Sequence, residues 1–246
     1  MNQLEKAEDL ARRSWVLRRS ILGATNSRTL SSALILATVY VQQQQFDEGD
    51  PLTAEALRQI RSLADFNDLY LPYQLSELGW TYLEHGQVAK ADELCDLGLQ
   101  AVRRKPDANP LFLPRVITHL GAVRLAQEKY AEAEALLRES SRLAEKRRPD
   151  AAYRYYVMSL LGASLAGQKK FTEAEPLLLQ GYEGLQQRQA SLPPILNAPR
   201  RITEAHERLV QLYDAWGKLA QAVEWKQKLA AFQQVNKAVE KKPEQQ

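Results

Sequence analysis

The side chains in this sequence that could carry out chemistry are three histidines, one cysteine and several acidic pairs. His85, His119 and His206 are isolated, and no acidic residue is placed beside them as in a His-Glu-x-x-His zinc site. Glu132 and Glu134 are two residues apart, so on a helix they point to different faces and cannot form a catalytic pair. We therefore expect no metal, no cofactor and no catalytic residue, and the chain is predicted not to be an enzyme.

Cys95 is the only cysteine, which excludes an internal disulfide and a multi-cysteine metal site. It lies where the surrounding pattern requires an apolar residue, so we expect a buried, unreactive thiol. The N-terminus lacks the apolar core of a secretory signal, and no apolar run reaches the roughly 18 residues of a membrane span. These features predict a soluble, cytoplasmic protein with no membrane partner.

The charges of the 246 residues are nearly balanced, with 33 basic and 30 acidic side chains and a net charge of +3. This balance does not require nucleic acid as a partner. Basic clusters occur at 103–105, 146–148 and 200–201, and the first two are followed by Pro-Asp. We interpret the clusters as cations at the C-terminal ends of helices, because a nucleic-acid surface would need interleaved aromatic residues.

A phrase that recurs five times dominates the sequence. Its copies begin at Leu36, Leu78, Leu120, Leu161 and Leu209, in steps of 42, 42, 41 and 48 residues. The leucine is usually followed by a small residue, then by an apolar anchor ten positions on, and by another small residue three positions later. The anchors are Phe46, Val88, Tyr130, Phe171 and Leu219, and the closing small residues are Gly49, Ala91, Ala133, Ala174 and Ala222.

Each copy is typical of two helices joined by a short turn. Two antiparallel helices approach to roughly 8–10 Å only where their contact residues are short. The first helices supply glycine at Gly79, Gly121 and Gly162, and the closing alanines supply the short residues on the second helices. In the fourth copy we expect Thr172 to cap the second helix.

This pattern resembles the tetratricopeptide repeat, in the longer form found in kinesin light chains. The resemblance implies an all-α fold, a right-handed superhelical solenoid of antiparallel helix pairs. Arg124, Thr53 and Lys226 depart from it, at positions where the family prefers apolar or aromatic residues. The last two copies are also similar to the repeat-containing tails of planctomycete-type bacterial serine/threonine kinases, although no kinase motif occurs here.

We expect a single solenoid over residues 1–232, followed by a frayed polar tail at 233–246. A single helix leads at 2–22, and either caps the stack or mediates contact with another molecule, including self-association. The helix pairs are predicted at about 28–64, 72–103, 113–147, 152–189 and 201–232. The proline-rich segment 191–199 is predicted to be a spacer, and the alternative is a segment that folds into the groove of the solenoid.

The first helix of each pair lines the concave side of such solenoids. Trp80, Tyr73 and Tyr156 could be binding anchors there, or could pack against neighbouring helices instead. The lysine–asparagine clamp with which some relatives hold a terminal carboxylate is not visible. The predicted groove residues are Tyr73, Ser76, Trp80, Leu83, Arg115, Thr118, Ala122, Tyr156, Ser159, Ala163, Glu207, Gln211 and Asp214.

The function that these features favour is non-enzymatic: a scaffold that holds a peptide or partner protein in its groove. One alternative is a regulatory or targeting tail of a signalling kinase. The other is a single-strand RNA-binding helical repeat, whose affinity would fall steeply with salt.

Overall fold

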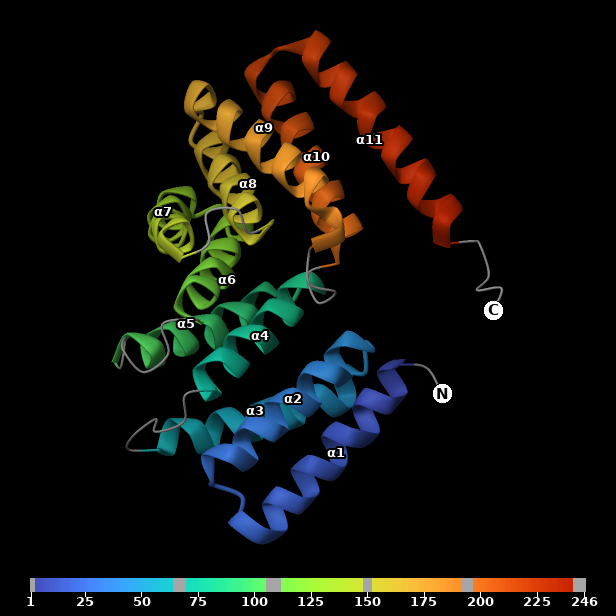
Figure 1. Cartoon of the computed structure of the whole chain (residues 1–246). Helices are drawn as coiled ribbons and strands as arrows, with labels where there is room; N and C mark the ends of the chain where they lie inside the picture. Colours follow the sequence, from blue (N-terminus) through green and yellow to red (C-terminus); the bar gives the residue numbers. More distant parts are fainter. Residues whose placement is uncertain (1–2, 64–69, 105–111, 148–151, 192–196, 241–246) are drawn as a thin grey trace. The chain divides into compact units, whose positions relative to one another are not determined.

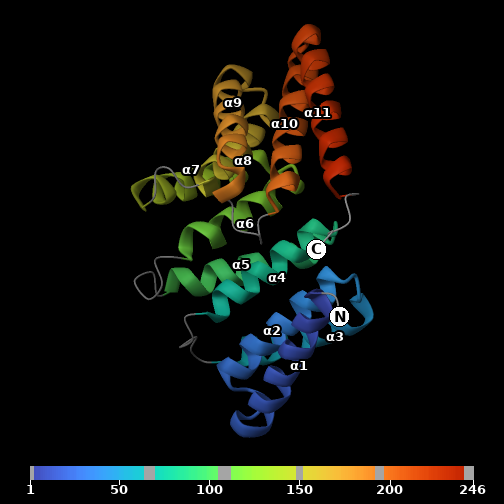
Figure 2. The same cartoon turned by 45° about the vertical axis from the view of Figure 1, so that its right-hand side comes forward.

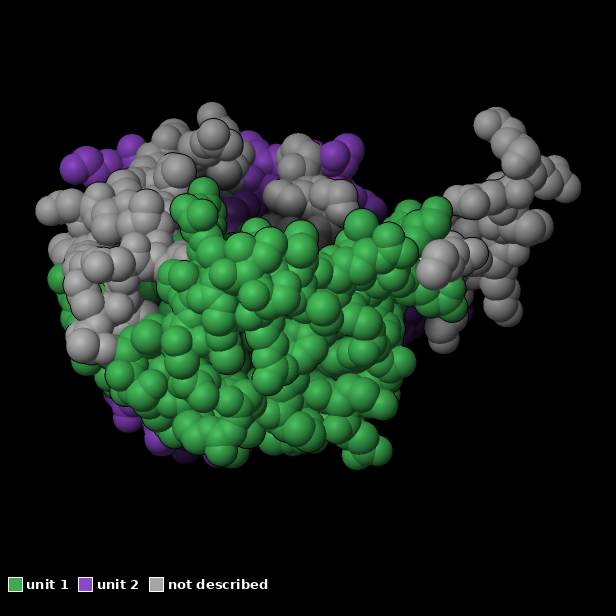
Figure 3. Space-filling model, turned by 90° about the horizontal axis from the view of Figure 1, so that it is seen from below, with its two compact units in different colours: residues 1–127 green, residues 128–246 purple. Residues whose placement is uncertain are grey.

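The computed structural model describes residues 3–63, 70–104, 112–147, 152–191 and 197–240, and every regular element among them is a helix (Figure 1). No strand occurs in these ranges, which confirms the all-α prediction. The chain divides into two compact units, residues 1–127 and residues 128–246 (Figure 3). None of the described helices combines the length and apolar character that a membrane-spanning helix needs.

The first unit contains six helices within its described residues. They are α1 (Gln3–Leu22), α2 (Ser27–Gln42), α3 (Phe46–Ser62), α4 (Leu71–Glu84), α5 (Val88–Arg104) and α6 (Leu113–Ala126). The leading helix α1 packs on α2, while α2 with α3 and α4 with α5 form helical hairpins. The first helices α2, α4 and α6 also contact one another in sequence order.

The described part of the second unit contains α7 (Tyr130–Arg147), α8 (Ala152–Gly167), α9 (Phe171–Gln187), a short 3-10 helix η1 (Gln189–Ser191), α10 (Ala198–Trp216) and α11 (Leu219–Glu240). Within it α8 pairs with α9 and α10 with α11, and α7 packs on α8 (Figure 2). The predicted pair at 113–147 therefore crosses the boundary between the units, with α6 in one and α7 in the other. A single solenoid over residues 1–232 stays a prediction.

Each apolar anchor of the repeated phrase is the first residue of a second helix. The chain reaches this residue through a left-handed turn, because the residue two positions earlier has a positive φ in every copy. The φ values are 61° at Gln44, 76° at Gly86, 59° at Glu128, 62° at Lys169 and 78° at Gly217. The expected cap at Thr172 is wrong: α9 already begins at Phe171, and no side chain caps it.

Replacing Lys169 with glycine should stabilise the second unit by about 1 kcal/mol, because a side chain with a Cβ is strained in the left-handed region. Gly86→Ala should destabilise the first unit by a similar amount, since it introduces the same strain. The free energies of unfolding of both variants, measured in urea, test these two predictions. Equal free energies of unfolding for Lys169→Gly and wild type would contradict this turn geometry.

Two of the three first-helix glycines lie against their second helices, as predicted. A Cβ on Gly79 would lie 2.6 Å from Sγ of Cys95, and a Cβ on Gly162 would lie 2.6 Å from Cγ of Leu178. Both distances are shorter than carbon atoms tolerate, so α4 with α5 and α8 with α9 pack closely because these residues lack side chains. Gly121 is buried on α6.

Two further glycines lie on the second helices, where helix backbone meets helix backbone. A Cβ on Gly98 would lie 2.8 Å from the Pro72 carbonyl oxygen, and a Cβ on Gly181 would lie 2.9 Å from the Ser159 amide nitrogen. The sequence analysis missed this contact, although a signal exists. The residue ten positions after the anchor is small in the first four copies: Ala56, Gly98, Ser140 and Gly181.

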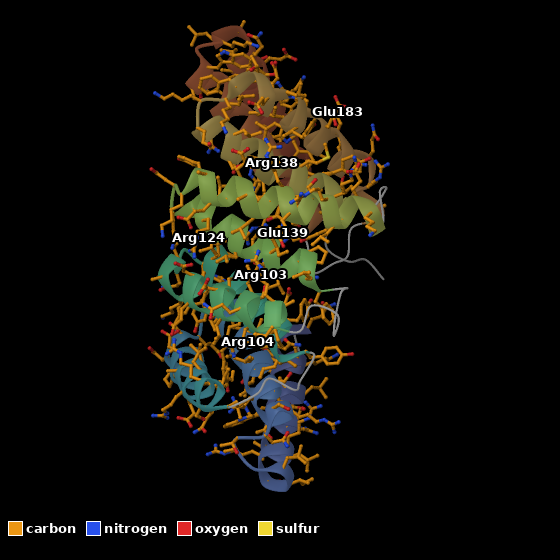
Figure 4. The ribbon with its side chains drawn as sticks, turned by 90° about the vertical axis from the view of Figure 1, so that its left-hand side faces the viewer. Arg103, Arg104, Arg124, Arg138, Glu139 and Glu183 are labelled. Atoms are coloured by element: carbon orange, nitrogen blue, oxygen red, sulfur yellow. The ribbon has the colours of Figure 1, made fainter. Side chains whose placement is uncertain are left out.

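The basic clusters do not share one structural role. Arg103 and Arg104 lie in the last turn of α5, as predicted (Figure 4), and Arg147 ends α7. The prediction is wrong for Arg200 and Arg201, which lie in the first turns of α10. That helix begins at Ala198, and the Asn197 side chain accepts a hydrogen bond from the Arg200 amide.

Two of the predicted boundaries also differ from the structure. Of the expected spacer 191–199, residues 198 and 199 already belong to α10, and residues 192–196 lie outside the described part of the chain. The helix α11 continues to Glu240, well into the segment for which a frayed tail was expected.

The three departures from the repeat pattern are compensated by polar contacts. Arg124 of α6, labelled in Figure 4, forms an ion pair with Asp92 of α5. The Thr53 hydroxyl bonds to the Gly49 carbonyl oxygen at 2.7 Å. Lys226 is exposed and lies 2.8 Å from a carboxylate oxygen of Asp214. Each polar residue thus has a partner, which explains why the apolar family residue is not required.

Candidate functional site

The strongest candidate surface lies in the first unit, where aromatic side chains of α4 stack on Phe112, the N-cap residue of α6, and on a side chain of α6 itself. The Tyr73 ring stacks on Phe112 with centroids 4.3 Å apart and an interplanar angle of 20°. The Trp80 indole stacks on the His119 ring at 4.9 Å and 22°. Tyr73 and Trp80 are half-buried, so each packs against the neighbouring helix and still keeps part of its ring surface accessible.

An ion pair between the two helices lies beside these stacks. Arg115 of α6 contacts Glu77 of α4 through two nitrogens, at 2.8 and 2.9 Å, and its guanidinium lies 5.5 Å from the Tyr73 ring centroid. Burial raises the pKa of the Glu77 carboxyl despite the opposing charge of Arg115. Burial also raises the pKa of Tyr73 to about 12. The ion pair therefore fixes the orientation of Arg115 and of the Tyr73 ring.

Ser76 and His119 form a buried contact that resembles part of a catalytic triad. The Ser76 hydroxyl lies 2.8 Å from Nδ1 of His119, and Glu77 Oε1 lies 3.7 Å from the same nitrogen. A triad needs the acid on the opposite ring nitrogen from the serine, and Ser76 is 0% exposed. This geometry supports helix packing rather than nucleophilic catalysis.

The predicted groove residues differ widely in exposure. Half-buried ones are Tyr73, Trp80, Leu83, Arg115 and Ala163, and exposed ones are Glu207, Gln211 and Asp214. The buried members present no surface to a ligand in this structure: Ser76, Thr118, Ala122, Tyr156 and Ser159. We use the term α4–α6 face for the accessible surface made by Tyr73, Trp80, Leu83 and Arg115.

In the second unit, two predicted groove residues, Tyr156 and Ser159, contact arginines of α10. Arg201 is 1% exposed, and its guanidinium lies 5.3 Å from the Tyr156 ring centroid. Arg208 donates a hydrogen bond to the Ser159 hydroxyl at 3.1 Å. Both arginines also contact the Glu204 carboxylate, Arg201 at 2.8 and 2.9 Å and Arg208 at 3.3 Å. Tyr156 and Ser159 thus join α8 to α10.

The Glu204 carboxylate is held in its charged form by these arginines. Burial opposes ionisation of this carboxyl, but the charges of Arg208 and Arg201 outweigh burial, so its pKa is lowered. Sequence reasoning missed this cluster because it interpreted the neighbouring arginines as the end of a helix.

Cys95 and His206 are buried, whereas His85 is half-buried and lies edge-on to the Phe46 ring with centroids 6.0 Å apart. Cys95 is 0% exposed and burial raises the pKa of its thiol, which confirms the predicted buried thiol. His206 is 1% exposed and lies against the rings of Tyr182, Trp225 and Phe232. Burial lowers the pKa of the His206 ring, which favours its neutral form. Over the described ranges, no three His, Cys, Asp or Glu residues are grouped as metal ligands.

Comparison with known proteins places this geometry in a structural class. No protein-family model matches the chain, and no curated protein matches it. The crystal structure of BtubC (BKLC) from P. vanneervenii superposes with a TM-score of 0.66 at 18% identity, over 100% of this chain and 97% of that chain. A putative kinesin light chain from Podosopora anserina with nearly identical TPR-like repeats superposes with a TM-score of 0.60 at 20% identity, over 76% and 89% of the two chains.

The chain has the tetratricopeptide-repeat fold. The pilF protein of Pseudomonas aeruginosa superposes at a TM-score of 0.50 and 15% identity over 93% of this chain and 92% of its own. These identities show the fold alone. The resemblance to kinesin-light-chain repeats is thus confirmed at the level of structure, whereas the similarity to kinase tails stays a prediction.

The α4–α6 face is built from two consecutive first helices, α4 and α6, which contact each other. The repeat pattern predicted both helices, but it did not identify which positions the packing of α4 on α6 would bury.

Proposed function

We propose that this chain is a protein-interaction scaffold whose α4–α6 face binds a peptide or a partner protein. The observation that carries the proposal is the pair of ring stacks, Tyr73 on Phe112 and Trp80 on His119, which join two consecutive first helices. Half-buried aromatic side chains beside an arginine are the residue types that contribute most to binding energy at protein interfaces.

The α4–α6 face is organised before a partner arrives. The Tyr73 ring is fixed by Phe112 and Arg115, and the Trp80 ring by His119. Ordering a free side chain on binding costs about 0.5–1.5 kcal/mol. These two rings are already ordered in the folded unit, so binding does not lose this free energy. Leu83 adds a half-buried apolar side chain one helical turn from Trp80. A partner that presents apolar and aromatic side chains suits this surface.

In the second unit, the exposed part of α10 is a candidate for polar contacts. Glu207, Gln211 and Asp214 are exposed and lie at successive helical turns. None of the three is apolar, and Asp214 already pairs with Lys226 at 2.8 Å. These residues therefore favour polar groups of a partner over apolar ones.

Replacing Trp80 with alanine tests the proposal. We expect the variant to lose at least tenfold in affinity for the partner, because truncated aromatic anchors typically cost more than about 1.4 kcal/mol of binding energy. Trp216→Ala is the matched control: Trp216 is also half-buried and stacked, on Phe171 at 5.6 Å, but lies outside the α4–α6 face. Partners captured from native lysate are quantified for both variants and the wild type. Equal capture by Trp80→Ala and wild type would exclude the α4–α6 face as the binding surface.

Single-strand RNA binding is less well supported by this surface. Bases stack on open aromatic faces, whereas the rings of Tyr73 and Trp80 already stack on α6. A binding constant for RNA that falls steeply with salt would favour this alternative. The kinase-tail alternative requires a kinase reading frame directly upstream, which genomic sequence can test.

A further inference from the structure

The leading helix α1 has an apolar face that points to solvent. Leu10, Leu17 and Ile21 are 67%, 59% and 69% exposed, and their spacing places them on one stripe of the helix. Val16, on an adjoining part of the helix, is 54% exposed. The opposite side of α1 is the packed one, where Ala11 contacts the cluster of Leu36 and Tyr40 in α2. We refer to Leu10, Leu17 and Ile21 as the α1 stripe.

The residues at equivalent positions of the other second helices indicate what kind of element covers this face. If Leu4 is taken as the anchor of α1, Leu10 lies six residues after it, and leucine recurs at this position in the next four second helices: Leu52, Leu94, Leu136 and Leu177. In α5 this residue packs on the first helix, since the Cβ of Leu94 is 3.1 Å from the position of a Cβ on Gly79. Leu94 is 0% exposed and Leu52, Leu136 and Leu177 are half-buried, whereas Leu10 is exposed. The position of Leu10 is thus at least partly covered on the other second helices and is open on α1.

We infer that the helix received by the α1 stripe is α1 of a second copy of this chain, aligned antiparallel. The charges along α1 favour this occupant. Its acidic residues, Glu5, Glu8 and Asp9, lie near the N-terminal end together with Lys6, and its arginines, Arg12, Arg13, Arg18 and Arg19, follow toward the C-terminal end. An antiparallel pair places the more acidic end of each helix beside the basic end of the other, while a parallel pair places the basic ends together.

Two ion pairs within α1 can exchange partners with a second copy. The pairs Glu8–Arg12 at 2.7 Å and Asp9–Arg13 at 2.9 Å are exposed, and exposed pairs of this kind are weak and readily exchanged. Arg18 instead donates hydrogen bonds to the Ser32 hydroxyl and the Arg28 carbonyl oxygen of α2. A two-fold symmetric pair with Leu10 facing Leu17 of the second copy buries the stripe of both copies at once. Because the contact consists of a single helix from each copy, the dimer is weak rather than obligate.

Sedimentation of the untagged chain over roughly 1–200 µM tests this inference, since a weak dimer dissociates in the micromolar range. We expect a concentration-dependent dimer for the wild type and a monomer throughout for Leu17→Glu, with at least a tenfold loss of association. Val223→Glu is the matched control, because Val223 of α11 is similarly exposed at 53%. A monomeric wild type overturns the inference. So does a dimer that survives Leu17→Glu, or one that only Val223→Glu abolishes.

Cysteine cross-linking tests the orientation. A disulfide needs Cβ atoms about 3.5–4.5 Å apart. In the antiparallel pair, a mixture of Leu10→Cys and Leu17→Cys cross-links while neither variant alone does, and a parallel pair gives the reverse result. The native Cys95 is fully buried and does not interfere. This inference does not depend on the α4–α6 face, so Trp80→Ala should leave the dimer unchanged.

Discussion

Replacing Gly181 with alanine should destabilise the second unit by about 2 kcal/mol, although the same change normally stabilises a helix. In an exposed helix, alanine is favoured over glycine by about 1 kcal/mol. At Gly181 the added carbon would lie 2.9 Å from both the Ser159 amide nitrogen and the Tyr155 carbonyl oxygen. Both contacts are with backbone atoms of α8, so no side-chain rotation relieves them and the helices must separate. Overpacking of this kind costs about 1–3 kcal/mol, and sometimes more.

Gln180→Ala is the matched control for this prediction, because Gln180 precedes Gly181 on α9 and is exposed. Urea unfolding followed by amide exchange in α8 and α9 measures both variants. We expect no loss for Gln180→Ala and a clear loss for Gly181→Ala. A stabilised Gly181→Ala variant would show that α8 and α9 do not meet at their backbones.

Replacing Glu204 with glutamine should destabilise the second unit by about 3 kcal/mol, the cost typical of removing one partner from a buried ion pair. Glutamine keeps the shape of the side chain, but Arg201, which is 1% exposed, then loses its carboxylate partner. Glu173→Gln is the matched control, because the Glu173 carboxylate is 59% exposed and lies 3.7 Å from Arg138. Removal of such an exposed charge should change the free energy of unfolding by less than about 0.5 kcal/mol.

The pH dependence of the Glu204→Gln effect follows from the direction of the pKa shift. The pKa of Glu204 is lowered in the folded state from its ordinary value of 4.5. Its contribution to stability is therefore fully present above pH 4.5 and is lost as the pH falls through the lowered folded-state pKa. The difference in unfolding free energy between wild type and Glu204→Gln should be largest near neutral pH and shrink in acid. A difference that grows in acid would contradict the assigned ion pair.

The sequence predicted the helices and their close contacts because both depend on local residue types. The leucine–glycine step at Gly79 and Gly162 and the anchors that open the second helices recur at a nearly fixed period, and each reflects a contact within one hairpin. The same reasoning placed Cys95 correctly in the core. Local pattern also predicted the end of this pair at about residue 103, and α5 ends at Arg104.

The candidate surface was predicted less well because it depends on contacts between hairpins. Ser76 and Thr118 are on helices that were expected to line a groove, but both are 0% exposed. The contact of Ser76 with His119 joins residues 43 positions apart. Arg201 was misplaced because a basic pair suits a helix end of either kind until its carboxylate partner is known. Side-chain burial between neighbouring hairpins is not encoded in the period of the repeat.

Amide hydrogen exchange of the chain with its captured partner bound tests the central claim, that the α4–α6 face is the binding surface, most directly. We predict slower exchange on binding in α4 and α6, around Tyr73, Trp80 and Arg115. We predict unchanged exchange in the second helices α3 and α5. Protection confined to α3 and α5, with α4 and α6 exchanging as in the free chain, would contradict the account.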